Sequence, residues 1–185
     1  MSEYTPEPDE PETHDNLRGG ADFDHPEPPH PVNWNLLTAN DLEAELLELN
    51  RWVDWLRHTY GLPASVVPPY WHRHPELLWE LSALHLHWLC AYDPEQNGSA
   101  PLGWHRDFAD ARNRLREWVA ASGTRLDRDR PTRQTTWPGE DPAPPVEDVI
   151  IADRESEFVD FMIADVERRR QAEEEFFAAI AGEEP

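Results

Sequence analysis

Proline is the residue that most constrains this chain, because a proline inside a helix removes a backbone hydrogen bond and breaks the helix. Of the 19 prolines, seven lie in residues 1–33 and five in residues 131–145. Residues 1–33 are also acidic and poor in apolar side chains, so they cannot bury enough surface to offset the entropy lost on folding. We therefore expect a disordered acidic N-terminal tail at 1–33, a helical core domain at 34–121, a linker rich in Pro, Arg and Asp at 122–148, and a C-terminal amphipathic helix at 149–185.

Three segments of the core domain have the periodicity of amphipathic helices, and we expect helices at 41–60, 75–92 and 101–121. Asn40 and Glu43 have the spacing of a capping box at the start of the first helix. A glycine follows the first and third helices, as is typical of helix ends. The apolar stripe of the first helix consists of Leu42, Leu46, Leu49, Val53, Leu56 and Tyr60. These features predict an all-α fold built on a compact three-helix bundle.

The second helix is apolar over most of its circumference, which is typical of a helix that is buried on several sides. Its less apolar stripe consists of Glu76, Glu80, Ala83, His87 and Cys90. We therefore expect 75–92 to be the enclosed central helix of the bundle. In the third helix we expect the inward-facing residues to be Trp104, Phe108, Ala111, Leu115, Trp118 and Val119.

The C-terminal helix is expected from Asp153 to Ala181, with Phe158, Met162, Phe176 and Ile180 aligned along it. Asp165 and Arg169 interrupt this stripe. Three arrangements are consistent with the pattern: the helix docks back on the core, pairs with a copy of itself to form a homo-oligomer, or binds a groove on a partner.

The formal net charge of −22 is concentrated in the flanking segments. Such a chain is repelled by nucleic-acid phosphates and anionic membranes, so we expect neither as a direct partner and favour a basic protein instead. The absence of lysine among the 16 basic residues excludes a Schiff-base lysine and a P-loop lysine. The single Cys90, the absence of a signal-peptide pattern at the start and the absence of a long apolar run predict a cytoplasmic protein.

The histidines near the second helix raise the hypothesis of a metal site, because His72, His74, His87 and Cys90 are residue types that bind zinc. Helical geometry argues against a simple site, since residues two apart on a helix point to different sides. His85 and His87 therefore cannot share an ion. Cys90 lies near a helix end, where the dipole does not lower a thiol pKa, so we expect neither a cofactor nor an enzymatic activity.

The central block resembles an actinobacterial family from plasmids, prophages and conjugative elements, catalogued as domain of unknown function 4913. The resemblance covers roughly residues 45–121 and is carried by Trp71, His74, Pro75, Glu76, Leu81, Leu84, Trp88, Trp104 and His105. The family has no assigned activity, so the resemblance implies no catalytic residue. It implies that the protein serves a mobile genetic element of a bacterium with GC-rich DNA.

Two roles are open for the residues that carry this resemblance. Trp71 and His74 could latch the connector at 61–74 onto the second helix. Alternatively, a binding pocket could be lined by Trp71, His74, Trp104 and His105.

The function that the sequence favours is a non-enzymatic adaptor that binds a partner protein through its aromatic-rich helical domain and C-terminal helix. The residues expected on the partner surface are Trp52, Trp55, Phe158, Met162, Phe176 and Ile180. One alternative is an acidic mimic of nucleic acid that inhibits a DNA-acting protein. A second alternative is a metal-dependent enzyme that uses the His and Cys cluster.

Overall fold

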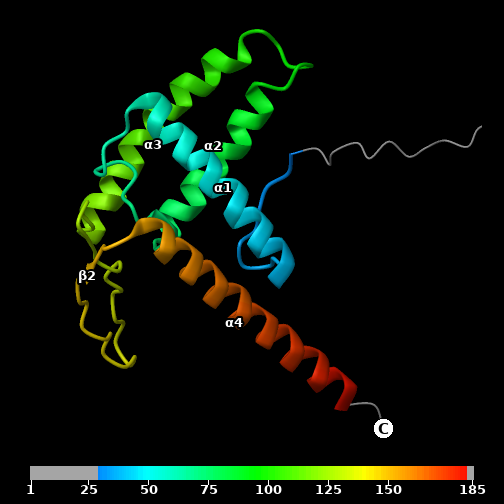
Figure 1. The fold of residues 1–185 in the computed structure, drawn as a ribbon, viewed down its shortest axis with the longest axis vertical. Coiled ribbons are helices and arrows are strands. Elements are labelled where there is room, and N and C mark those ends of the chain that lie inside the picture. Colours follow the sequence, from blue (N-terminus) through cyan, green and yellow to red (C-terminus); the bar gives the residue numbers. More distant parts are fainter. Residues whose placement is uncertain (1–28, 183–185) are drawn as a thin grey trace, which may run out of the picture.

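The computed structural model describes residues 29–182, and their secondary structure is almost entirely helical (Figure 1). The elements in chain order are α1 (Ala39–Tyr60), η1 (Trp71–Arg73), α2 (Pro75–Ala91), α3 (Ala100–Ser122), β1 (Arg128–Asp129), β2 (Val149–Ile150) and α4 (Arg154–Gly182). The prediction of an all-α fold with a C-terminal helix is therefore confirmed. Residues 1–28 lie outside the described part of the chain, so the predicted disorder of the N-terminal tail stays a prediction for them.

Helix α1 begins two residues before the predicted start, because its cap is Thr38. The Thr38 hydroxyl accepts a hydrogen bond from the Asp41 N–H at 3.2 Å and donates one to the Asp41 carboxylate at 2.7 Å. The expected Asn40–Glu43 capping box is therefore wrong, since Asn40 already lies inside the helix. At the other end, Gly61 caps α1 in the left-handed conformation with φ of 58°, as expected for a glycine at this position.

Helices α2 and α3 pack against each other, but α2 is less enclosed than its composition suggested. Its buried residues are Leu77, Leu81, Leu84 and Ala91, while Trp79 is exposed. In α3 the expected inward residues are buried except Trp118, which is exposed. Trp118 was expected to face inward, and the exposed Trp79 shows that α2 is not enclosed on every side. Helix α2 packs against α1, α3 and η1, and α4 packs against α1 rather than against the α2–α3 pair, so neither tryptophan is covered.

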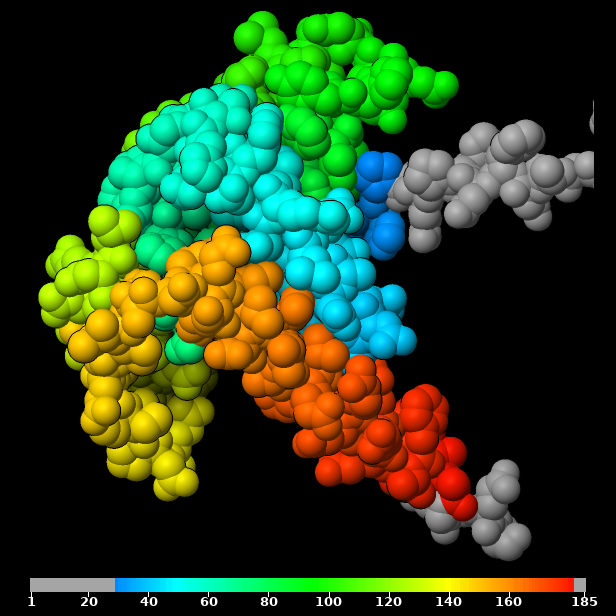
Figure 2. Space-filling model, viewed as in Figure 1, coloured from blue at the N-terminus to red at the C-terminus, as the bar shows by residue number. Residues whose placement is uncertain are grey.

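Helix α4 docks on α1 and runs antiparallel to it (Figures 1 and 2). Phe158, Met162 and Val166 of α4 belong to the main hydrophobic core. Glu173 accepts a hydrogen bond from the Ala39 N–H, at 2.8 Å, at the first residue of α1. Docking is thus the observed arrangement for α4 up to Glu173, and its last residues project beyond the start of α1 (Figure 2).

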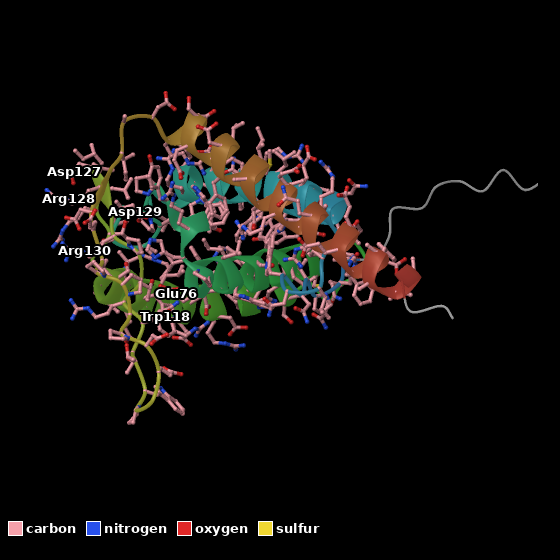
Figure 3. The ribbon with its side chains drawn as sticks, turned by 90° about the horizontal axis from the view of Figure 1, so that it is seen from below. Glu76, Trp118, Asp127, Arg128, Asp129 and Arg130 are labelled. Carbon is pink, nitrogen blue, oxygen red and sulfur yellow. The ribbon has the colours of Figure 1, made fainter. Side chains whose placement is uncertain are left out.

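The segment expected as a linker, 122–148, is attached to the helical body at its start. β1 pairs antiparallel with β2, with Arg128 opposite Ile150 and Asp129 opposite Val149. Along β1 the side chains alternate: Arg128 and Arg130 point outward, while Asp129 points toward the helices and is completely buried (Figure 3). This alternation follows from the two-residue period of a strand, and it places one carboxylate inside the protein.

Candidate functional site

His74, which lies just before α2, is completely buried and lies within 4.0 Å of the carboxylates of Asp129 and Glu76. Its Nε2–H donates to Asp129 Oδ1 at 2.8 Å, and its Nδ1–H donates to the Thr132 hydroxyl at 3.1 Å. Thr132 donates in turn to Glu76, and the Thr124 hydroxyl donates to Asp129 Oδ1 at 2.8 Å. These hydrogen bonds join the start of α2 to residues 124–132.

This hydrogen-bond pattern suits an imidazolium at His74, because Nε2 faces a carboxylate and the hydroxyl beside Nδ1 gives its own proton to Glu76. Burial by itself lowers the pKa of His74, but the hydrogen bond with Asp129 and the nearby Glu76 carboxylate outweigh burial and raise this pKa to about 9. The nearest Glu76 carboxylate oxygen lies 3.6 Å from Nδ1. Burial likewise opposes ionisation of Asp129, yet hydrogen bonds from His74 and Thr124 hold its pKa below the ordinary value.

The charged state of His74 predicts that the free energy of unfolding falls as pH rises from about 7 to about 9. A group with a raised folded pKa stabilises the fold fully below its unfolded pKa, about 6.5 for histidine, and this stabilisation is lost as pH rises through the folded value. One proton gives a slope of at most about 1.4 kcal/mol per pH unit. Urea unfolding across this range measures the slope, and Asp129→Asn should reduce it. A level wild-type profile would contradict the imidazolium assignment.

His72, only two residues earlier, has the opposite protonation state. Burial, reinforced by the positive charges of Arg154 and Arg73, lowers the pKa of His72 to about 3. The neutral ring donates from Nε2 to Glu157 at 2.7 Å, while its buried Nδ1 has no hydrogen-bond partner within the described residues. In the neutral ring, Nδ1 is an unprotonated acceptor, so the atom without a partner is a neutral nitrogen rather than a charged N–H donor. This agrees with the low pKa of His72.

Glu157 connects this second pair to α4. Its carboxylate accepts hydrogen bonds from both His72 and Arg73. Burial raises the pKa of Glu157, and the adjacent Arg73 opposes that rise. His72 also packs edge-on against the rings of Phe158 and Phe161, at 5.1 and 4.9 Å between centroids. The first turns of α4 are therefore held to η1 by both charge and apolar contact.

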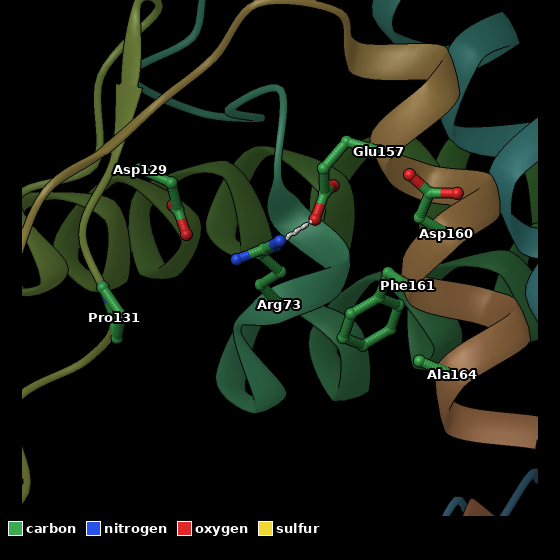
Figure 4. A pocket seen from close by; sticks show the side chains of 7 residues that line it. All are labelled: Arg73, Asp129, Pro131, Glu157, Asp160, Phe161 and Ala164. Carbon is green, nitrogen blue, oxygen red and sulfur yellow. Dashed lines mark hydrogen bonds and ion pairs between the residues drawn. The ribbon is translucent and has the colours of Figure 1, made fainter. Parts of the chain in front are cut away.

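A pocket of about 520 Å³ lies between the two clusters (Figure 4). Arg73 lies at its centre, with Glu157 on one side and Asp129 on the other; Asp160, Phe161, Ala164 and Pro131 complete the lining. Asp129 Oδ2 is buried and has no hydrogen-bond partner within the described residues. Glu157 pairs with Arg73 and accepts a hydrogen bond from the neutral His72. Asp129 pairs with the charged His74. These contacts hold η1, β1 and the start of α4 together.

The four residues proposed for a binding pocket lie in different environments. Trp71, His74 and Trp104 are buried, and His105 is exposed beside Tyr92. Trp104 stacks on Phe108 at 4.9 Å, and its indole N–H points to the Leu84 carbonyl at 3.4 Å. The four therefore do not line one pocket. His74 acts instead as a latch, although the segment it holds is 124–132 rather than the connector at 61–74.

The six residues proposed for a partner surface divide into buried and exposed groups. Trp52, Phe158 and Met162 are buried in the core, whereas Trp55, Phe176 and Ile180 are exposed. Trp55 packs on Trp88 at 5.0 Å, and Trp88 packs on Tyr92 at 5.5 Å. The outcome is a partly exposed aromatic row on α1 and α2, together with an apolar end on α4.

The residues considered as metal ligands have other contacts or lie apart. His72 and His74 are bound to Glu157 and Asp129, and His87 bonds to Asp107 of α3 at 3.0 Å. Cys90 is exposed on the same helix. Within residues 29–182, no group of three or more His, Cys, Asp or Glu side chains is arranged to hold a metal ion. In the same part of the chain, no helix is long and apolar enough to cross a membrane.

No sequence pattern predicted a role for four residues of these clusters, Asp129, Thr132, Arg154 and Glu157. Asp129 lies in the run RLDRDR, where nothing distinguishes it from Asp127. Arg154 and Glu157 lie at the start of a helix that is rich in charges throughout. No local signal marks these residues, because their partners are more than fifty residues away in the chain.

Comparisons of the chain with protein-family models, with curated proteins and with solved structures found no match. The resemblance to the mobile-element family therefore stays a prediction from the residues that carry it.

Proposed function

We propose that the protein is a non-enzymatic adaptor that binds a partner protein through the projecting end of α4. The main support is the exposure of Phe176, Phe177 and Ile180, which are 62, 67 and 52% accessible. Contiguous exposed apolar side chains on a helix mark interaction sites. They lie in the part of α4 that follows Glu173, the last α4 residue hydrogen-bonded to α1 (Figure 2).

The charge of this surface indicates the chemistry of the partner. Glu173, Glu174 and Glu175 immediately precede the apolar residues. The positive charges of the preceding turns have intramolecular contacts: Arg168 pairs with Asp165, Arg170 with Glu167, and Arg169 donates to the Trp34 and Asn35 carbonyls. A complementary partner has an apolar groove with a basic rim. A second copy of this chain would bring like charges together at the end of the helix.

The biological setting of this adaptor is part of the proposal. The resemblance of residues 45–121 supports service to a mobile genetic element, and the single cysteine supports a reducing cytoplasmic compartment. The partly exposed row of Trp55, Trp88 and Tyr92 is a second aromatic surface for the same partner.

A photo-reactive amino acid at position 177, introduced in host cells, tests this function. We expect one discrete adduct with a basic protein. Substituting Glu174→Gln and Glu175→Gln should reduce its yield, because the charge attraction is removed. The same amino acid at Leu102, equally exposed but on α3, is the matched control and should not give this adduct.

Two results would refute the adaptor. One is the absence of any adduct specific to position 177. The other is an adduct of twice the chain mass that persists after the glutamates are neutralised, which would assign the surface to self-association.

A further inference from the structure

A second cavity, of about 650 Å³, lies where the end of α1, the connector at 61–70 and the start of α4 meet. Its walls are mainly apolar and include Val53, Leu62, Val67 and Pro68, all buried. Leu126, 73% exposed, lies on its lining and connects it to the surface. The volume lies in the range typical of small-molecule sites, which are mostly apolar with a few polar groups.

The first polar group in this cavity is the indole of Trp71. Trp71 is 1% exposed and lines the cavity, and its buried Nε1–H has no acceptor within the described residues. Buried donors are nearly always paired, because an unpaired donor loses its hydrogen bond to water without compensation. A ligand acceptor in the cavity would supply the missing partner.

The second polar group is the guanidinium of Arg154. It donates to the Asn50 side chain and to the Pro69 carbonyl, and it lies over the Phe158 ring at 5.2 Å. All three contacts are neutral, and within residues 29–182 no carboxylate lies within 4.0 Å of its nitrogens. Burial lowers the pKa of Arg154 below its ordinary value. A partly buried cation without a contacting anion is costly, and a bound carboxylate offsets that cost.

The other charges that line the cavity are Asp54, Arg57 and Glu155. Asp54 is engaged by Arg57 at 3.0 Å on the exposed side of α1. Glu155 is exposed and attracts Arg154 only from a distance. Among the cationic groups of the cavity, Arg154 is therefore the one available to a ligand.

We propose that this cavity binds a small apolar monocarboxylate. The apolar part of the ligand lies against Val53, Val67 and Pro68. Its carboxylate accepts hydrogen bonds from Arg154 and from the Trp71 indole. This site is separate from the projecting end of α4 and does not depend on the adaptor function.

Calorimetric titration of the full chain with 2-naphthoate and with 2-naphthamide, a neutral analogue of the same shape, tests the site. We expect naphthoate to bind at least about tenfold more tightly than naphthamide, because only the carboxylate pairs with the charge of Arg154. Arg154→Gln should weaken naphthoate binding by about tenfold or more and leave naphthamide unaffected. Arg130→Gln, an exposed arginine paired with Asp148 outside the cavity, is the control and should bind as wild type.

Trp71→Phe is the second variant, because it removes the indole N–H but keeps an aromatic ring and leaves the contacts of Arg154 with α1 and the connector in place. We expect a loss of several-fold to about tenfold in naphthoate affinity. Melting temperatures of all variants, measured alongside, identify any variant that is not folded. Equal affinity for the acid and the amide, undiminished binding by both folded variants, or no binding by the wild type would each overturn the proposal.

Discussion

Replacing Asp129 with alanine should lower the free energy of unfolding by about 3–5 kcal/mol. The substitution leaves the buried His74 imidazolium without its main anion and removes the closer of the two acceptors of the Thr124 hydroxyl. Losing one partner of a buried ion pair costs far more than losing an exposed pair, because water cannot solvate the charge that remains. Urea unfolding followed by far-UV circular dichroism at neutral pH measures this loss.

Asp127→Ala is the matched control for this substitution. Asp127 lies two residues before Asp129 in the same charged run, but its side chain is 71% exposed and contacts only Arg128 among the described residues. Its removal should change stability by about 0.5 kcal/mol or less. A similar loss for both variants, or a loss below about 1 kcal/mol for Asp129→Ala, would show that the cluster does not hold the 124–132 segment in place.

Replacing Phe158 with alanine should cost about 3–5 kcal/mol, the usual range for a buried aromatic side chain. Phe158 is buried in the main core between α1 and α4, where it contacts the His72 ring and carries the Arg154 guanidinium over its face. Its removal leaves a cavity under the first turns of α4 and weakens their docking. We expect a lower unfolding midpoint in urea and faster proteolysis near 149–153, because the helix then opens locally.

Phe176→Ala, in the same helix, is the control. Its ring is exposed in the projecting end, so its loss should change stability by about 0.5 kcal/mol or less. A large loss for Phe176→Ala would show that the projecting end is packed in solution, as it would be against a second copy. Equal, small losses for both variants would contradict the docking of α4 on α1.

Features that depend on a few neighbouring residues were predictable. Gly61 and Gly123 end α1 and α3 with positive φ angles of 58° and 78°, and Pro75 begins α2. Each prediction rests on backbone stereochemistry that acts within one helical turn. The start of α1 was wrong by two residues because Thr38 and Asn40 are both good caps, and their local sequences do not decide between them.

Burial was less predictable, because it depends on what covers a helix face. Trp79 and Trp118 have the composition and periodicity of core residues, yet both are exposed. Other helix faces are covered by α4 and by residues 124–132. Both segments follow all three helices in the chain. Periodicity defines an apolar face, but it does not show which of several such faces a distant segment will cover.

The amino-acid sequence by itself determined the helical class of the protein, the ends of α1 and α3, the start of α2 and the acidic character of its flanks. These follow from backbone stereochemistry and composition, which act locally. Only the tertiary structure decided that His74 is charged and His72 neutral, that Asp129 rather than Asp127 is buried, and that Arg154 lines a cavity beside Trp71. Charge state and burial depend on partners that lie 55 to 104 residues away in the chain. These partners meet only when α4 packs on α1 and β1 packs at the start of α2.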